Sequence, residues 1–236
     1  MQPGFQTVKL KLTRYRMQFI LKLIEIFIHL DEYLGEVIRN YGTWTYLLLF
    51  LIIFMETGLV VTPFLPGDSL IFAAGTFAGM GDLNVWVLWI LLSVAAVIGD
   101  TVNYWIGHYI GPRAFSGQVR FLKKEYMERT HAFYERHGGK TIILARFIPI
   151  IRTFAPFVAG IGAMSYGHFI AYNVVGGIAW VTLFLFGGYF FGGLKFVQDN
   201  FSFVVIAIIL ISVMPAFIEV FKERARHSKE VAAKGS

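Results

Sequence analysis

Apolar residues fill three long stretches of this chain, at 85–106, 169–191 and 201–218. Each stretch falls in the range of about 17–25 residues that an α-helix needs to cross a bilayer. A helix satisfies its own backbone hydrogen bonds in lipid, which an open strand cannot do. The pattern therefore predicts an all-α polytopic membrane protein with transmembrane helices at these three places.

Two other apolar regions, 44–80 and 141–164, are interrupted by residues that break helices. Proline lacks a backbone N–H and disfavours helical conformation in the residue before it. The limb after the first break, 69–80, covers only about 18 Å, which is too short to cross the membrane. Each region is therefore predicted to fold as a re-entrant helical hairpin. The predicted hairpin-breaking residues are Pro63, Pro66 and Gly67 in the first region and Pro149 and Pro156 in the second.

The two hairpins occupy matching places in the chain, because a complete span follows each of them. If each hairpin returns to its own side of the membrane, the second unit is inverted relative to the first. Paired broken helices in an inverted repeat are typical of transporters whose binding site lies near the bilayer midplane. The order of elements thus favours a transporter.

Polar segments flank and divide the membrane domain. An amphipathic helix at 19–41 carries a charged stripe and is predicted to lie in the membrane interface; a spanning helix with that stripe buried in protein is the alternative. The predicted organisation is a basic tail and interfacial helix at 1–40, a membrane domain at 41–221 with a surface segment at 111–140, and a basic tail at 222–236. The positive-inside rule places the surface segment and the C-terminus in the cytoplasm, while the side of the N-terminus stays open.

The composition agrees with a membrane protein. Of the residues, 56% are hydrophobic and 15% are charged, and the mean hydropathy is +0.62. The net charge is +6, yet no lysine or arginine occurs between Asn40 and Pro112. This uneven distribution is typical of membrane loops and argues against nucleic-acid binding. The chain has no cysteine, which excludes disulfides and thiolate metal sites.

The charges inside the two hairpin units divide by sign. From 40 to 112 every formal charge is acidic, and from 141 to 194 the only charges are those of Arg146 and Arg152. Each charge at membrane depth costs about 2.5–3.5 kcal/mol. Irregular backbone at that depth is tolerated only inside protein or beside a wet cavity. A polar central cavity is therefore expected. The acids are Glu56, Asp68, Asp82 and Asp100.

Such a cavity suits an anion. Arginine presents a planar fork of donors that matches phosphate, so Arg146 and Arg152 are the predicted ligands of a phosphate headgroup. Glu56 and Asp68 would repel a phosphate when ionised. Burial favours the neutral form of a carboxyl group, so these two acids are predicted to carry protons or to gate the cavity.

A structural alternative stays open for the same residues. The acids and arginines can form ion pairs that lock the hairpins together, without any substrate. Asp68 follows Pro-Gly and can cap a helix. Asp100 is interpreted as a polar contact between helices, and Asp82 as an ordinary loop residue.

The chain lacks the patterns of a catalytic triad, a zinc protease and a nucleotide-binding loop. His131 and His137 belong to the polar segment and have no third ligand nearby in the sequence. We therefore expect neither an enzyme activity nor a cofactor nor a metal.

Several sequence blocks closely resemble the DedA family of bacterial inner-membrane proteins. They are FMETGLVVTPFLPGDSLIFAAG, GDTVNYWIGHYIG, the block from FYERHGGK through ARFIPIIRTFAPFVAG to GGIAW, and GYFFG, which together cover roughly residues 41–195. The resemblance implies an inner-membrane carrier that returns undecaprenyl phosphate to the cytoplasmic leaflet and depends on the proton-motive force. It also implies that the acids matching Glu56 and Asp68, and the arginines matching Arg146 and Arg152, are essential.

Three functions are consistent with these residues. The leading hypothesis is a flippase for polyprenyl phosphate, with that lipid or another anionic phospholipid as the partner. The second is a proton-coupled exporter or antiporter of a small solute or cation, in which the acids act. The third is an organiser of envelope proteins that transports nothing. Assembly as a homo-oligomer is left open.

Overall fold

A computed structural model describes residues 29–59, 67–115, 140–147, 149–162 and 164–201, together with 203, 204, 206–208 and 210. Every regular element within these residues is a helix, so the prediction of an all-α protein is confirmed for the described part of the chain. The helices are α2 (Leu30–Tyr41), α3 (Trp44–Gly58), α4 (Gly67–Met80), α5 (Val85–Phe115), α7 (Lys140–Ala145), α8 (Pro149–Ile161), α9 (Tyr166–Phe191) and α10 (Lys195–Asp199).

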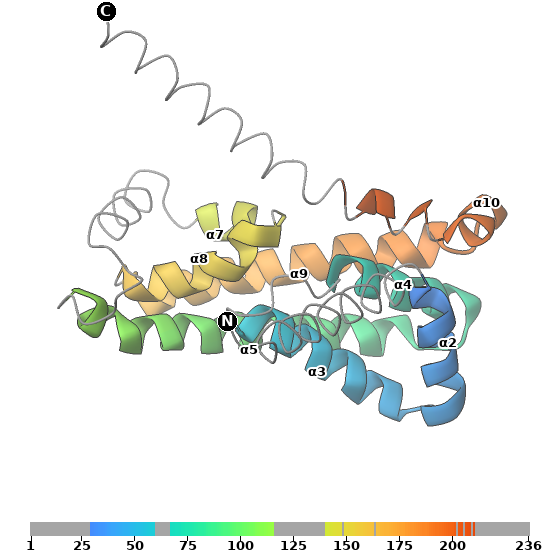
Figure 1. The fold of residues 1–236 in the computed structure, drawn as a ribbon, viewed down its shortest axis with the longest axis horizontal. Helices are drawn as coiled ribbons and strands as arrows, with labels where there is room; N and C mark the ends of the chain where they lie inside the picture. The colour runs from blue at the N-terminus through green and yellow to red at the C-terminus, as the bar shows by residue number, and fades with distance from the viewer. Residues whose placement is uncertain are drawn as a thin grey trace, which may run out of the picture.

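The helices α5 and α9 form the long axis of the molecule (Figure 1). Val85–Ile110 and Tyr166–Phe191 are long and apolar enough to cross a membrane, which agrees with two of the predicted spans. The two helices are antiparallel neighbours, because the rings of Trp86 and Phe186 lie 5.7 Å apart, and those of Tyr104 and Phe169 lie 4.5 Å apart. The third predicted span falls mostly outside the described residues.

The helix α5 starts where the sequence provides a cap, and it ends later than expected. Asn84 Oδ1 accepts hydrogen bonds from the backbone N–H groups of Trp86 at 3.0 Å and Val87 at 3.1 Å, which satisfies two donors of the first turn. The helix continues to Phe115. The predicted surface segment therefore starts within α5, and residues 116–139 lie outside the described part of the chain.

Both broken regions contain two helices separated by a short connection. In the first, α3 ends at Gly58 and α4 begins at Gly67, while Pro63 and Pro66 lie outside the described residues. In the second, Pro149 is the first residue of α8, a position where the missing N–H has no helical partner to lose.

The prediction that Pro156 breaks a helix is wrong. This proline lies inside α8, which continues to Ile161. An internal proline removes one helical hydrogen bond and costs about 3 kcal/mol. The helix packs closely on α5 at this point, because a Cβ on Gly107 would overlap the carbonyl oxygen of the next residue, Phe157.

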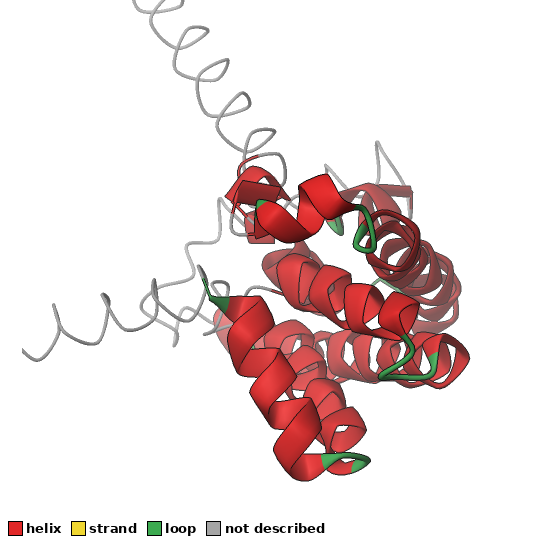
Figure 2. Cartoon of the chain, turned by 90° about the vertical axis from the view of Figure 1, so that its right-hand side faces the viewer, coloured by secondary structure: helices red, strands yellow, loops and turns green. Residues whose placement is uncertain are grey.

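Figure 2 shows the bundle of helices end-on, and the contacts between the helices are reciprocal. The second helix of each broken region packs on the long helix of the other unit: α4 on α9, and α8 on α5. The first helix packs on the long helix of its own unit: α3 on α5, and α7 on α9. Chain connectivity alone does not produce this exchange of partners.

Glycines bring the backbones together in the same way at both exchanged interfaces. At each interface, one glycine on each helix lies against a backbone carbonyl of the partner helix, and a Cβ there would overlap the carbonyl oxygen. Small residues are what allow helices in membranes to approach this closely. The glycine and carbonyl pairs are Gly75 with Leu185 and Gly188 with Phe72 between α4 and α9, and Gly160 with Tyr104 and Gly107 with Phe157 between α8 and α5.

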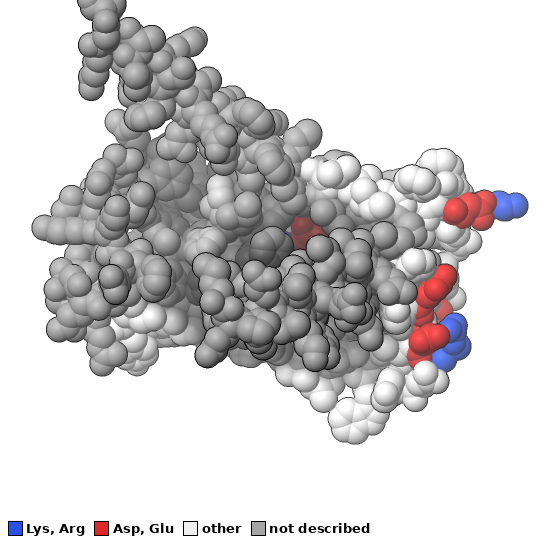
Figure 3. All heavy atoms as spheres, viewed as in Figure 1, with Lys and Arg blue, Asp and Glu red and all other residues white. Residues whose placement is uncertain are grey.

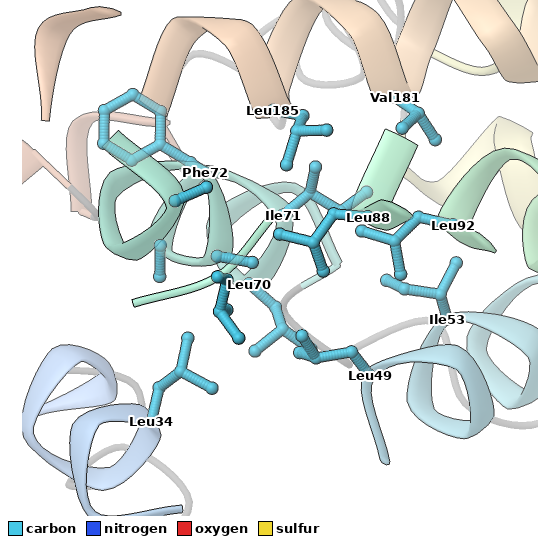
Figure 4. Packing of buried hydrophobic residues seen from close by; sticks show 14 of the residues in the cluster. Leu34, Leu49, Ile53, Leu70, Ile71, Phe72, Leu88, Leu92, Val181 and Leu185 are labelled. Atoms are coloured by element: carbon cyan, nitrogen blue, oxygen red, sulfur yellow. The ribbon is translucent and has the colours of Figure 1, made fainter. Parts of the chain in front are cut away.

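One main hydrophobic core joins α2, α3, α4, α5 and α9 (Figure 4). Leu34 of α2 lies in this core, whereas Glu32, Glu36 and Arg39 of the same helix are exposed. The predicted amphipathic character is therefore confirmed for the described part of this helix. Its location in the membrane interface stays a prediction. Core residues labelled in Figure 4 include Leu34, Leu49, Ile53, Ile71, Leu88, Leu92, Val181 and Leu185.

The outer surface of the long helices is also apolar. On α5, Trp86, Ile90, Val94 and Ile98 are exposed at a spacing of four residues, which makes a continuous apolar stripe. On the face shown in Figure 3, charged side chains of the described residues gather at one end, apart from a small acidic area near the middle. A helix that is apolar both on the face packed in the core and on the face exposed at the protein surface is typical of a membrane span.

Candidate functional site

Five charged side chains converge where the broken regions meet the long helices. The five residues are each between 1% and 8% exposed. The four residues that the sequence predicted as site residues are among them, and the fifth is an acid of α5. The cluster consists of Glu56 from α3, Asp68 from α4, Asp100 from α5, Arg146 from the turn after α7, and Arg152 from α8.

Arg152 joins the two broken regions. Its Nη2 donates a hydrogen bond of 2.6 Å to Glu56 Oε1, and its Nη1 donates one of 2.5 Å to Asp68 Oδ1. Its guanidinium carbon also lies 4.7 Å from the ring centroid of Trp180, and the Trp180 Nε1 donates to Asp68 Oδ1 at 2.8 Å. Both terminal nitrogens of Arg152 are thus bound to carboxylates of the first broken region.

Arg146 makes a different set of contacts. Its Nη2 donates to Asp100 Oδ2 and to Asn173 Oδ1, while Asn173 Nδ2 donates to the carbonyl of Val97 at 3.0 Å. A glycine pair in α9 makes room for this side chain: a Cβ on Gly176 would lie 3.3 Å from Arg146 Cδ. Arg146 therefore pairs with an acid of a long helix, and not with Glu56 or Asp68 of the first broken region.

The fold holds the Glu56 carboxylate against the first turn of α4. A Cβ on Gly67 would overlap Glu56 Oε2, so only glycine lets the carboxylate approach the helix there. The N-terminus of a helix carries partial positive charge, which stabilises a nearby anion. Gly67 was predicted only as a breaking residue, and the structure gives it this second role.

Asp68 does not act as a helix cap. It lies in the first turn of α4, which begins at Gly67, and its Oδ1 accepts from Arg152 and Trp180. Of the other charged candidates, Asp82 is an exposed turn residue outside the cluster, as the sequence indicated. His131 and His137 lie outside the described residues.

Several polar atoms of the cluster are buried without a hydrogen-bond partner among the described residues. They include Glu56 Oε2, Asp100 Oδ1, and the Nε and Nη1 of Arg146. A buried polar atom left unpaired costs about 1–3 kcal/mol, and more when it is charged. With all groups ionised, the cluster has two positive and three negative charges, so 2 − 3 = −1. Its chemistry is that of a site able to take up a proton, water or a polar ligand.

The sequence indicated Asp100 only as a polar contact between helices, whereas it pairs with Arg146 in the cluster. Trp180, Asn173 and Asn103 were not among the predicted site residues. Asp100 carried a usable signal, because an ionisable residue inside an apolar span is by default a functional candidate. Asn103 Nδ2 donates to the carbonyl of Thr57 at 3.1 Å and to that of Thr153 at 2.9 Å, and so ties both broken regions to α5. Trp180 has no distinguishing sequence pattern; only its burial between the arginines reveals it.

Comparison with known proteins gives consistent matches over most of the chain. The VTT domain matches residues 65–190. Protein DedA of Escherichia coli K12 is 53% identical over 211 residues, which cover 88% of this chain and 96% of that protein. An uncharacterised membrane protein of Mycobacterium leprae is 42% identical over 186 residues, covering 77% of this chain and 83% of that protein.

The inner membrane protein YqjA of Escherichia coli K12 is 34% identical over 148 residues, which cover 62% of this chain and 67% of that protein. No solved structure matches the chain at a significant level. The matches include the segments that carry the buried arginines and the acids of α4 and α5. The chain therefore belongs to the DedA family of VTT-domain membrane proteins.

Proposed function

We propose that the protein moves a polyprenyl phosphate carrier lipid, undecaprenyl phosphate, between the leaflets of the bacterial inner membrane, and that protons drive this movement. The observation that carries the proposal is the buried cluster itself. Two guanidinium groups and three carboxyls meet in an otherwise apolar protein. Charges inside a membrane domain mark substrate pathways and proton relays.

Aromatic residues near the ends of the long helices support a cluster close to the bilayer midplane. On α5, the exposed rings of Trp86 and Tyr109 are 23 residues apart, about 35 Å along the helix, which suits two interfacial belts. Asp100 lies about 21 Å from the first ring and about 14 Å from the second. Trp180 lies on the other side of the middle, because α9 runs antiparallel to α5.

The reciprocal packing supports an inverted repeat of two re-entrant hairpins, which is part of this proposal. The second helix of each hairpin packs on the long helix of the other unit, with matched glycine and carbonyl contacts at both interfaces. In transporters built this way, one unit rocks against the other around a central site. The site then opens to one leaflet at a time, while the polyprenyl tail stays in the bilayer.

Charge balance explains how protons would be coupled to the lipid. The cluster carries −1 when all its groups are ionised, and a phosphate monoester adds −1 to about −2. Binding the headgroup therefore becomes favourable only when carboxyls of the cluster take up protons. Protonation of Glu56 or Asp68 also weakens its ion pair with Arg152. The proton and the lipid phosphate would consequently be bound and carried in the same direction.

The excess of carboxyls over guanidinium groups also favours a second candidate function. A proton-coupled antiporter of a small solute or cation would use the acids as its binding site. The neighbouring arginines would then set how readily these acids lose their protons. The two functions differ in cargo. A cation antiporter exchanges protons for a small ion in vesicles that contain no polyprenyl phosphate, and a flippase does not.

The decisive experiment uses the purified protein in vesicles that contain undecaprenyl phosphate. The headgroup exposed outside is measured over time by an impermeant phosphatase, with and without a pH gradient. We expect the protein to speed translocation and the gradient to bias it. Arg152→Gln should abolish the effect, whereas Arg39→Gln, which changes an exposed arginine of α2, should not. Translocation at the rate of protein-free vesicles would contradict the proposal.

A further inference from the structure

The two buried arginines have different tasks, an inference that rests on the proposed transport of a phosphate lipid. We infer that Arg146, Asp100 and Asn173 form the anion subsite, in which Arg146 contacts the phosphate and Asp100 occupies its place when no substrate is bound. Arg152 is a positioning residue that holds the hairpin regions together. The difference follows from which donors each arginine has already used.

Neither terminal nitrogen of Arg152 is without a partner. Both of them bind carboxylates, and these carboxylates come from two different helices. The face of its guanidinium lies on the indole of Trp180. Each of these nitrogens keeps one further N–H, but a phosphate bound there would lie against the carboxylates of Glu56 and Asp68, whose negative charge repels it.

Arg146 keeps most of its donors. A guanidinium has five N–H groups, and the two on Nη2 serve Asp100 and Asn173. The Nε and Nη1 carry the other three, and neither atom has a partner among the described residues, although the side chain is only 2% exposed. Unpaired cationic donors in a buried place are what an anion subsite requires.

Asp100 has the properties of an exchangeable partner. It pairs with one nitrogen of Arg146, and its Oδ1 has no hydrogen-bond partner among the described residues. A phosphate offers three oxygens and can satisfy Nη2 together with further donors of the same guanidinium. Once Asp100 is protonated or has moved away, the phosphate forms more charge-assisted hydrogen bonds than the carboxylate did.

Asn173 keeps Arg146 in place during this exchange. Its amide accepts from Arg146 and donates to the carbonyl of Val97 in α5, so the orientation of the amide is determined by both bonds. Asn173 is neutral and does not compete with an anion. The glycine pair Gly176 and Gly177 lets the arginine lie close to the backbone of α9.

The test is binding of a simple phosphate lipid, hexadecyl phosphate, to the purified full-length protein in detergent, measured by calorimetry. Asp100→Asn should tighten binding by roughly tenfold, because it removes the competing charge without changing shape. Arg146→Gln should weaken binding by roughly tenfold or more. Asp82→Asn, which removes an exposed carboxylate outside the cluster, should change it by less than about threefold.

A gain of affinity in Asp100→Asn is informative because a misfolded variant does not produce it. Equal effects of Asp100→Asn and Asp82→Asn, unchanged binding in Arg146→Gln, or no binding of the probe to any of these proteins would each overturn the subsite. Inorganic phosphate in a parallel titration separates recognition of the headgroup alone from recognition of the lipid. If Asp100→Asn tightens binding but vesicles show no translocation, the subsite stands and the proposed transport fails.

Discussion

Trp180 Nε1 donates a hydrogen bond of 2.8 Å to Asp68 Oδ1, across 112 positions of the chain. The indole is fully buried, and its ring lies within 5.9 Å of the guanidinium carbon of Arg146 and 4.7 Å of that of Arg152. One aromatic side chain of α9 therefore contacts both cations and one acid of the cluster. It links the two broken regions through a long helix that belongs to neither of them.

Replacing this indole should separate its hydrogen bond from its ring. Trp180→Phe loses the N–H and should lower the free energy of unfolding by about 1 kcal/mol. Trp180→Leu also loses the cation–π contacts and leaves a cavity, for a total of about 3–5 kcal/mol. Thermal unfolding in detergent measures both effects, and vesicle assays should show reduced translocation.

The matched control for this series is Trp89→Phe. Trp89 Nε1 also donates a hydrogen bond of 2.8 Å, but to the hydroxyl of Thr182, away from the cluster. This variant should lose a similar amount of stability and keep its transport rate. If both phenylalanine variants behaved alike in transport, Trp180 would have no special connection to the site.

Breaking the Arg152 ion pairs should cost more than removing an exposed charge. Arg152→Gln leaves Glu56 and Asp68 buried without their cation, which should lower the free energy of unfolding by about 3–5 kcal/mol. Adding Glu56→Gln to this variant should recover part of the loss, because one of the unpaired acids is then neutral. Asp82→Asn, in an exposed turn, should change stability by less than about 0.5 kcal/mol.

A double-mutant cycle compares the pairs directly. Glu56 and Arg152, which are bound at 2.6 Å, should show a coupling energy of about 1–3 kcal/mol. The coupling of Glu56 with Arg146 should be smaller, because no hydrogen bond joins them. Larger coupling in the second cycle would show that the arginines exchange partners in the membrane.

Alanine at the close helix contacts should destabilise both exchanged interfaces. A Cβ on Gly188 would overlap the carbonyl oxygen of Phe72, and one on Gly107 would overlap that of Phe157. Each substitution should cost about 1–3 kcal/mol, because whole helices must move apart. Gly167 of α9 has open space around it, so Gly167→Ala should be neutral or slightly stabilising. Unfolding temperatures of the three variants provide the comparison.

Binding of the phosphate lipid should weaken as the pH rises. The cluster holds the guanidinium groups of Arg146 and Arg152 and the carboxyls of Glu56 and Asp100. Every proton lost at higher pH adds a negative charge near the headgroup, so the binding constant must fall. Asp100→Asn cannot ionise at that position and should show a flatter pH dependence. Calorimetric titrations at several pH values measure both slopes, and a binding constant that rises with pH would contradict proton coupling.

The class of the protein and four of the five charged residues of the cluster could be predicted from the sequence. Long apolar runs require helices in a membrane, and two of the predicted spans correspond to α5 and α9. The four costly charges Glu56, Asp68, Arg146 and Arg152 could be expected to meet, because an isolated charge in an apolar region is too unfavourable to persist. This expectation depends on local chemistry alone.

The pairing of these groups could be read only from the three-dimensional packing of the helices. The partners of Arg152 lie 84 and 96 positions away, and pairing at that separation depends on how whole helices pack, which no local pattern records. The same packing brought Asp100 to Arg146, placed Trp180 between the two arginines, and kept α8 continuous through Pro156. Local chemistry says that a buried charge needs a partner, and three-dimensional packing determines which one it obtains.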